Sequence, residues 1–119
     1  HRLRLRRLTH NQMIEVTFDK RDQNLRGFEF KGHAGYAESG KDIVCAGVSA
    51  LVLNMINSVE EFCEDKYMLD INEDMGHVVF SFIDDPSYNA ILLINSLELG
   101  IKGIKETYSQ HINLNYREV

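Results

Sequence analysis

The chain has 119 residues, 44% of them hydrophobic and 26% charged, with a formal net charge of −5. These values fit one soluble globular domain with a single core. No uninterrupted apolar run reaches the ~18 residues that a membrane span needs, so we expect no membrane partner.

The first twelve residues differ from the rest, because they hold four arginines and no acidic residue. We interpret residues 1–12 as an expression remnant and Met13 as the natural start; a basic targeting arm is the alternative. Without the four arginines, 9 of the 13 basic side chains remain beside 18 acidic ones, so residues 13–119 carry a formal net charge of −9. Such a domain repels nucleic acid and attracts basic peptides. We expect residues 13–119 to form a single domain with no direct nucleic-acid partner.

Residues 13–19 alternate apolar and polar side chains, which predicts a half-buried strand. A polar stretch over 19–24 predicts a hairpin turn, and residues 25–31 predict a second strand. The segment 32–41, GHAGYAESGK, contains three glycines and predicts a loop.

Asp42 precedes a long apolar run, so we expect it to cap a helix over 43–62. The first half of this helix is apolar almost all round, which predicts a helix buried on several sides. Residues 67–72 and 77–83 predict two further strands joined by a turn.

A second helix is predicted to begin at Pro86, because proline suits the first helical position and the aspartate before it suits the cap. Apolar side chains at spacings of three or four continue to about Tyr108, and alternation over 112–116 predicts a last strand. The element order is β-β-α-β-β-α-β. We expect an α+β fold in which an antiparallel sheet, or two such sheets, packs on two long helices.

Cys45 falls in the first turn of the predicted helix if Asp42 is the cap. Backbone N–H groups in a first turn lack intrahelical partners, and the helix dipole adds about half a positive charge there. Both features favour a thiolate over a thiol, and the same N–H groups can hold an oxyanion during acyl transfer. Cys45 is therefore a candidate nucleophile; the alternative is a small buried hydrophobic residue.

His33 is the histidine best placed to assist Cys45, because the glycine loop between them can fold back towards the helix. A neutral imidazole can take the thiol proton and return it to a departing amine. A solvated loop histidine is the alternative. Asp42 either caps the helix or orients His33 as the third member of a triad.

Several nearby residues have more than one interpretation. Ser49 lies one turn after the cysteine and bonds the loop, the thiolate or its own helix backbone. Gly32 and Gly35 bring the loop close to a substrate or form a turn, and Tyr36 covers an apolar substrate side chain or lies at the surface.

The remaining residues indicate no metal and no cofactor. The spacing of the two cysteines suits neither a disulfide framework nor a zinc site, and no phosphate-binding or dinucleotide motif is present. Both cysteines are expected to be reduced. Cys63 ends the helix among acidic residues that raise a thiol pKa, so we expect it to be unreactive.

Three short motifs stand at fixed spacing: GHA at 32–34, DIVCA at 42–46 and SAL at 49–51. Together they resemble the ribosomal-processing cysteine protease family, called Prp, and the resemblance extends over the whole chain from Met13. Gly47 departs from the pattern, since alanine is common at this position.

The resemblance implies that His33 and Cys45 form a catalytic dyad. It implies active-site support from Gly32, Asp42, Ala46 and Ser49, and a substrate loop that includes Ala34, Gly35, Tyr36 and Gly40. Members of the family remove the N-terminal extension of a large-subunit ribosomal protein, cutting after two phenylalanines and leaving a basic N-terminus. The expected protein is therefore a cytoplasmic, homodimeric cysteine endopeptidase without a cofactor, whose partner is a ribosomal protein precursor.

Two other classes of function stay open. A non-enzymatic ribosome-associated peptide-binding module would use the loop for recognition and Cys45 as a core residue; an RNA-binding role would need a basic face, which the net charge disfavours. A redox-sensing thiol protein would need a resolving cysteine, and Cys63 lies about 27 Å further along the same helix.

Overall fold

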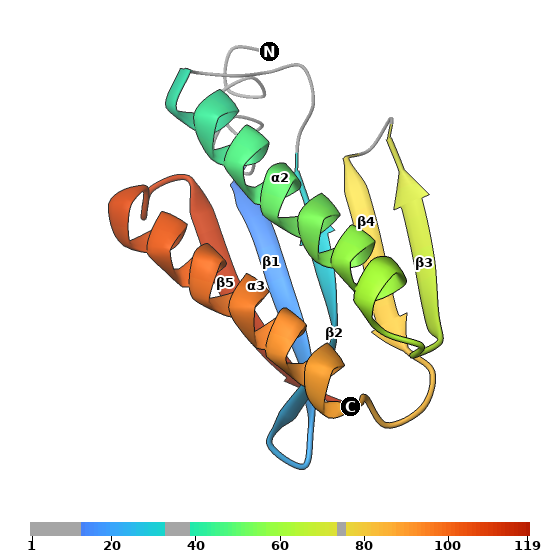
Figure 1. Ribbon diagram of the computed structural model, residues 1–119. Helices are drawn as coiled ribbons and strands as arrows, with labels where there is room; N and C mark the ends of the chain where they lie inside the picture. Colours follow the sequence, from blue (N-terminus) through green and yellow to red (C-terminus); the bar gives the residue numbers. More distant parts are fainter. Residues whose placement is uncertain (1–12, 33–38, 74–75) are drawn as a thin grey trace.

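The computed structural model describes residues 13–32, 39–73 and 76–119, and for residues 39–42 only the backbone. Its elements follow the predicted order and are shown in Figure 1. They are β1 (Ile14–Arg21), β2 (Asn24–Lys31), α2 (Ser39–Phe62), β3 (Tyr67–Asn72), β4 (His77–Phe82), α3 (Tyr88–Thr107) and β5 (Ile112–Glu118). The α+β class is confirmed.

The five strands form one sheet in the order β3-β4-β2-β1-β5. The pairs β1/β2, β2/β4 and β3/β4 are antiparallel, as expected, but β5 lies parallel to β1. The expectation of a wholly antiparallel sheet is therefore wrong, and the sheet is mixed. The reason is that α2 connects β2 to β3 and α3 connects β4 to β5, and a helix-length crossover returns the chain to enter the sheet in the same direction.

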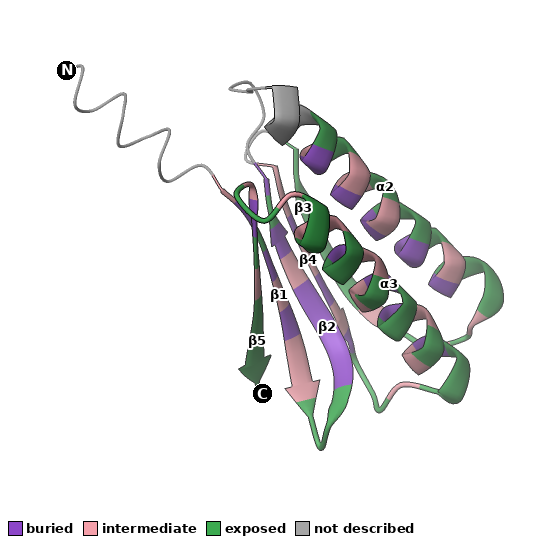
Figure 2. Cartoon of the chain, turned by 90° about the vertical axis from the view of Figure 1, so that its left-hand side faces the viewer, coloured by how far each residue is buried: buried purple, intermediate pink, exposed green. Residues whose placement is uncertain are grey.

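Both helices cover the same face of the sheet, and the core lies between these two layers (Figure 2). On β1, Ile14, Val16 and Phe18 are fully buried, while Glu15 between them is exposed, which confirms the predicted alternation. Phe28 of β2 continues this apolar face across the sheet. Neither of the two described helices covers the opposite face of the sheet.

Helix α2 is fully buried along the stripe that faces the sheet and half-buried where Gly47 and Leu51 meet α3, so the expectation of burial on several sides holds only in part. The buried residues are Val44, Val48, Val52, Met55, Ile56 and Val59. Ile43 and Leu53 lie on the outer side and are 57% and 51% exposed, because a two-layer fold offers the helix a single sheet to cover. By length and composition alone, its segment Ile43–Phe62 is long and apolar enough to cross a membrane. This is weak evidence, because the core helices of soluble proteins pass the same test.

Helix α3 begins two residues later than expected. The predicted start at Pro86 is wrong, and Ser87 is the N-cap, whose side-chain oxygen accepts a hydrogen bond from the backbone N–H of Ala90 at 3.2 Å. Asp65 holds the cap in place, because its carboxylate accepts hydrogen bonds from both the backbone N–H and the hydroxyl of Ser87. The predicted end near Tyr108 is confirmed, since this residue is the C-cap.

Candidate active site

Three segments meet beside Cys45: the end of β2, the beginning of α2 and the corner between β3 and β4. Gly32, directly after β2, is buried and donates a backbone hydrogen bond to the carbonyl oxygen of Gly76 at 2.7 Å. A Cβ atom at position 32 would lie 2.9 Å from Cζ of Phe30 and 3.3 Å from Sγ of Cys45. The backbone of Gly32 therefore passes immediately beside the sulfur, which leaves no room for a side chain there.

The structure corrects the expected position of Cys45 within its helix. Since α2 begins at Ser39, Cys45 is its seventh residue, and Asp42 lies inside the first turn instead of capping it. In a regular helix the N–H group of Cys45 bonds a carbonyl four residues earlier, and the N–H groups without such acceptors belong to residues 39–42. The expected thiolate stabilisation and oxyanion contacts from free N–H groups at 43–45 are therefore not supported. Cys45 is still a half-buried residue and is not sealed in the core.

The expected substrate loop is described only in part. His33, Ala34, Gly35 and Tyr36 lie outside the described residues, so their geometry relative to Cys45 stays a prediction. Gly40 lies in the first turn of α2, which corrects its expected position in a loop. The helix extends four residues further towards its N-terminus than the weak helix propensity of the glycine-containing stretch predicts.

The support residues on α2 differ in exposure. Ser49 is half-buried one turn after Cys45, and Ala46 is exposed. Ser49 also lines a groove of about 230 Å³ between α2, β3 and β4. The groove has a mainly apolar wall made by Phe30, Val52, Leu53, Ile71 and Val78. Because Ser49 is a single helical turn from Cys45, the groove begins close to the sulfur.

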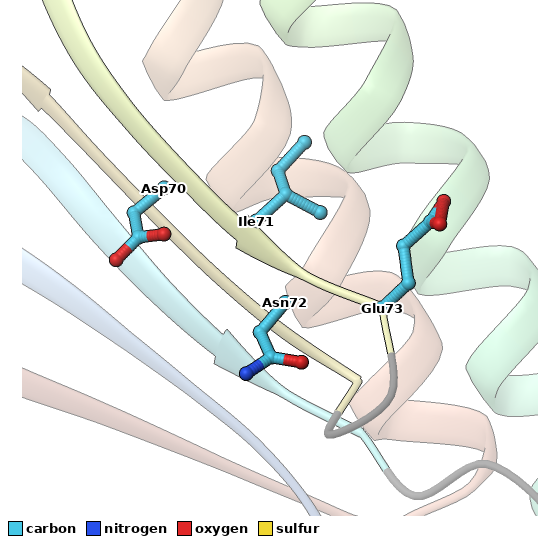
Figure 3. A pocket seen from close by; sticks show the side chains of 4 residues that line it. All are labelled: Asp70, Ile71, Asn72 and Glu73. Atoms are coloured by element: carbon cyan, nitrogen blue, oxygen red, sulfur yellow. The ribbon is translucent and has the colours of Figure 1, made fainter.

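The β3 side of this groove was not predicted from the sequence. Ile71 and Glu73 point towards the side of the sheet that α2 covers, while Asp70 and Asn72 point to the other side (Figure 3). These four residues also line a shallow hollow of about 520 Å³. Of the two acidic side chains, only that of Glu73 lies on the groove side, so one carboxylate borders the end of the apolar groove. This arrangement suits an apolar side chain next to a positive charge.

His77, for which the sequence suggested no partner, is engaged on the uncovered face of the sheet. Its Nε2 lies 2.6 Å from Oε2 of Glu29. This hydrogen bond lowers the pKa of Glu29, and the charges of Lys31, His77 and Arg117 lower it further, against the opposing effect of burial. His77 is therefore held on the opposite side of the sheet from α2.

Cys63, the second cysteine, has a raised pKa, as expected from the sequence. Burial is the main cause, and the charge of Asp65 adds to it, while a hydrogen bond with Ser87 acts in the opposite direction. The acidic neighbours are thus the smaller part of the effect. Within residues 13–32, 39–73 and 76–119, no three His, Cys, Asp or Glu side chains are grouped so that they could hold a metal ion.

Comparison with known proteins connects this geometry to a family. The family model described as Cysteine protease Prp matches residues 13–113. The ribosomal processing cysteine protease Prp of Bacillus subtilis (strain 168) is 36% identical over 107 residues, which are 86% of this chain and 96% of that protein.

Solved structures of the same kind share the fold. The structure of Prp from S. aureus in complex with a substrate peptide has a TM-score of 0.83 and 27% identity, and the match covers 88% of this chain and 100% of that one. A second S. aureus Prp structure, with a covalently linked product peptide, has a TM-score of 0.80 and 28% identity over the same shares of the two chains.

Proposed function

This chain belongs to the cysteine protease Prp family, and from that premise we propose that it removes the N-terminal extension of a large-subunit ribosomal protein precursor. Cys45 is the nucleophile in this proposal, and His33 is the general base and acid. The observation that carries it is the approach of the Gly32 backbone to the sulfur of the half-buried Cys45. Because His33 is bonded directly to Gly32, its chain segment begins beside the sulfur.

The chemistry proceeds in two steps. In the first, the Cys45 thiolate attacks the carbonyl carbon of the scissile bond, and the His33 imidazolium gives its proton to the departing amine. In the second, His33 takes a proton from water, the hydroxide attacks the thioester, and the thiolate leaves as the acid product forms. The covalently linked product peptide of the S. aureus relative supports a covalent step of this kind.

The groove beside Ser49 supports a peptide substrate with an apolar residue next to basic ones. Its wall accepts an apolar side chain, and the carboxylate of Glu73 at its end attracts a positive charge. The substrate peptide bound to the S. aureus relative supports the same class of partner. We assign the N-terminal segment of the ribosomal precursor, a basic peptide, to this groove.

The proposal includes a place and an assembly. The protein acts in the bacterial cytoplasm, where ribosomal precursors are made, and it acts as a homodimer without a cofactor, since a thiolate and an imidazole suffice for the chemistry. Ile43, an exposed apolar side chain on the outer side of α2 and outside the groove, belongs to the candidate dimer surface.

Incubation with the precursor ribosomal protein, followed by mass spectrometry of the products, tests the proposal. We expect the wild-type chain to release the N-terminal extension and Cys45→Ala to release none, because the nucleophile is gone. Cys63→Ala is the matched control and should cleave at the wild-type rate. Full cleavage by Cys45→Ala would falsify the assignment, and binding of the precursor without cleavage by the wild-type chain would favour a peptide-binding module.

A further inference from the structure

We propose that Gly76, at the start of β4, is a positioning residue for His33, acting through the peptide bond that joins Gly32 to His33. This inference rests on the proposed function, since it concerns the geometry of the same dyad. Gly76 lies 31 residues after Cys45 in the sequence, outside the three motifs that identify the family.

Two contacts connect Gly76 to Gly32. The backbone N–H of Gly32 donates to the carbonyl oxygen of Gly76 at 2.7 Å. A Cβ atom at position 76 would lie 2.6 Å from the carbonyl oxygen of Gly32 and 3.0 Å from its carbonyl carbon. A real Cβ atom is not found this close to backbone atoms, so a side chain at position 76 must push the Gly32 carbonyl and the Gly76 backbone apart.

The displaced group belongs to the peptide unit of His33. A peptide unit is planar, so its oxygen, carbon and nitrogen and the Cα atom of the next residue move together. Rotation of the Gly32 carbonyl therefore moves the Cα atom of His33. The other side of Gly32 faces the Sγ atom of Cys45, so its backbone has little room to absorb the change.

A purely local role for Gly76 makes a different prediction. Its φ of +62° lies in the left-handed region, and its N–H donates to the carbonyl oxygen of Glu73 at 3.2 Å, as in a tight turn. Asparagine tolerates this φ far better than alanine does. If Gly76 only closes the turn, Gly76→Asn should work nearly as well as glycine; if it positions His33, asparagine should fail as alanine does, because both carry a Cβ atom.

Kinetics of Gly76→Ala and Gly76→Asn separate the two roles. We expect kcat to fall by about 10²-fold in both, as for a catalytic group displaced by ~1 Å, with KM changed less than about threefold. Gly103→Ala is the matched control, since a Cβ atom there meets nothing within 4 Å, and it should retain wild-type kcat. Wild-type kcat in folded Gly76→Asn overturns the proposal.

The rate of Cys45 alkylation across pH can be measured without a substrate. A purely structural role of Gly76 would leave this rate unchanged. We expect alkylation of Cys45 at neutral pH to slow in both Gly76 variants, because the displaced imidazole no longer takes the thiol proton. An unchanged profile in either folded variant overturns the proposal. A wild-type chain that fails to cleave the precursor would count against the proposed substrate alone, because alkylation still reports on the dyad.

Hydrogen exchange in the wild-type chain covers the case in which neither variant folds. If Gly76 holds Gly32, the Gly32 amide should exchange as slowly as the amides of the β2–β4 ladder. Exchange at the rate of an unprotected amide overturns the proposal.

Discussion

Glu29 gathers three basic groups on the face of the sheet that the helices leave uncovered. Its carboxylate lies 2.6 Å from Nε2 of His77, 3.5 Å from Nη1 of Arg117 and 3.9 Å from Nζ of Lys31. The glutamate side chain is only 19% exposed, so its charge is partly shielded from water, whereas its partners are more exposed. A hydrogen bond to a carboxylate in such a setting contributes about 1–2 kcal/mol.

The lowered pKa of Glu29 predicts a pH-dependent contribution to stability. The contribution is fully present above pH 4.5, the ordinary pKa, and is lost as the pH falls through the lowered value. Glu29→Gln should therefore lower the free energy of unfolding by about 1–2 kcal/mol at pH 7, and the difference from wild type should shrink towards pH 3. Urea denaturation at both pH values measures this.

Glu15 provides the control for that measurement, because it is an exposed carboxylate on the neighbouring strand. Glu15→Gln should change the free energy of unfolding by less than about 0.5 kcal/mol at either pH. A Glu29→Gln variant with the same pH dependence as wild type would show that the Glu29–His77 pair does not stabilise the fold.

The two helices approach each other at glycines. Gly100 of α3 faces Leu51 of α2 so closely that a Cβ atom would lie 2.8 Å from Cδ1 of the leucine. Gly47 of α2 faces Ile104 of α3 at an ordinary contact distance of 3.4 Å. The same glycine-to-alanine change thus meets different surroundings in the two helices, although the gain in helix propensity is similar.

Gly47→Ala is predicted to stabilise the protein by about 0.5–1 kcal/mol, since alanine is the better helix former and its methyl group fits against Ile104. Gly100→Ala should gain less or destabilise, because Leu51 must move. Thermal unfolding of the two variants measures the difference. Equal stabilisation by both would mean that the helix contact adapts without cost, and a destabilised Gly47→Ala would mean that the site requires glycine.

The charge of the whole domain bears on how it finds its substrate. With a formal net charge of −9 over residues 13–119 and the Glu73 carboxylate at the end of the groove, the domain attracts a basic peptide at long range. Salt screens such attraction over a Debye length of about 8 Å at physiological ionic strength. Binding of the precursor should therefore depend on ionic strength much more than bond cleavage does.

We predict that KM for a basic precursor peptide rises several-fold between about 0.05 and 0.5 M NaCl while kcat stays constant. Glu73→Gln should weaken this salt dependence, because it removes a charge at the groove. Glu64→Gln, which removes an exposed charge just beyond the C-terminal end of α2, is the matched control and should leave it nearly unchanged. A KM that is independent of salt, or equal effects of the two variants, would contradict this role for the groove.

The sequence by itself determined the element order, the bounds of most elements to within two residues, and the family. The strand predicted over 67–72 has the same bounds as β3, and the predicted buried side of β1 is confirmed, because these patterns repeat along a single segment. The motifs around Cys45 likewise lie within one short stretch, so their resemblance to the protease family could be recognised without a structure.

Only the tertiary structure decided how separate segments meet. The parallel pairing of β5 with β1, the groove between α2 and β3, and the contact of Gly76 with Gly32 each join residues far apart in the chain. No local period encodes such contacts, since they depend on which strand each helix crossover reaches. The start of α2 at Ser39 was missed for a different reason: a glycine-containing stretch has weak helix propensity, and propensity alone does not decide where a helix begins.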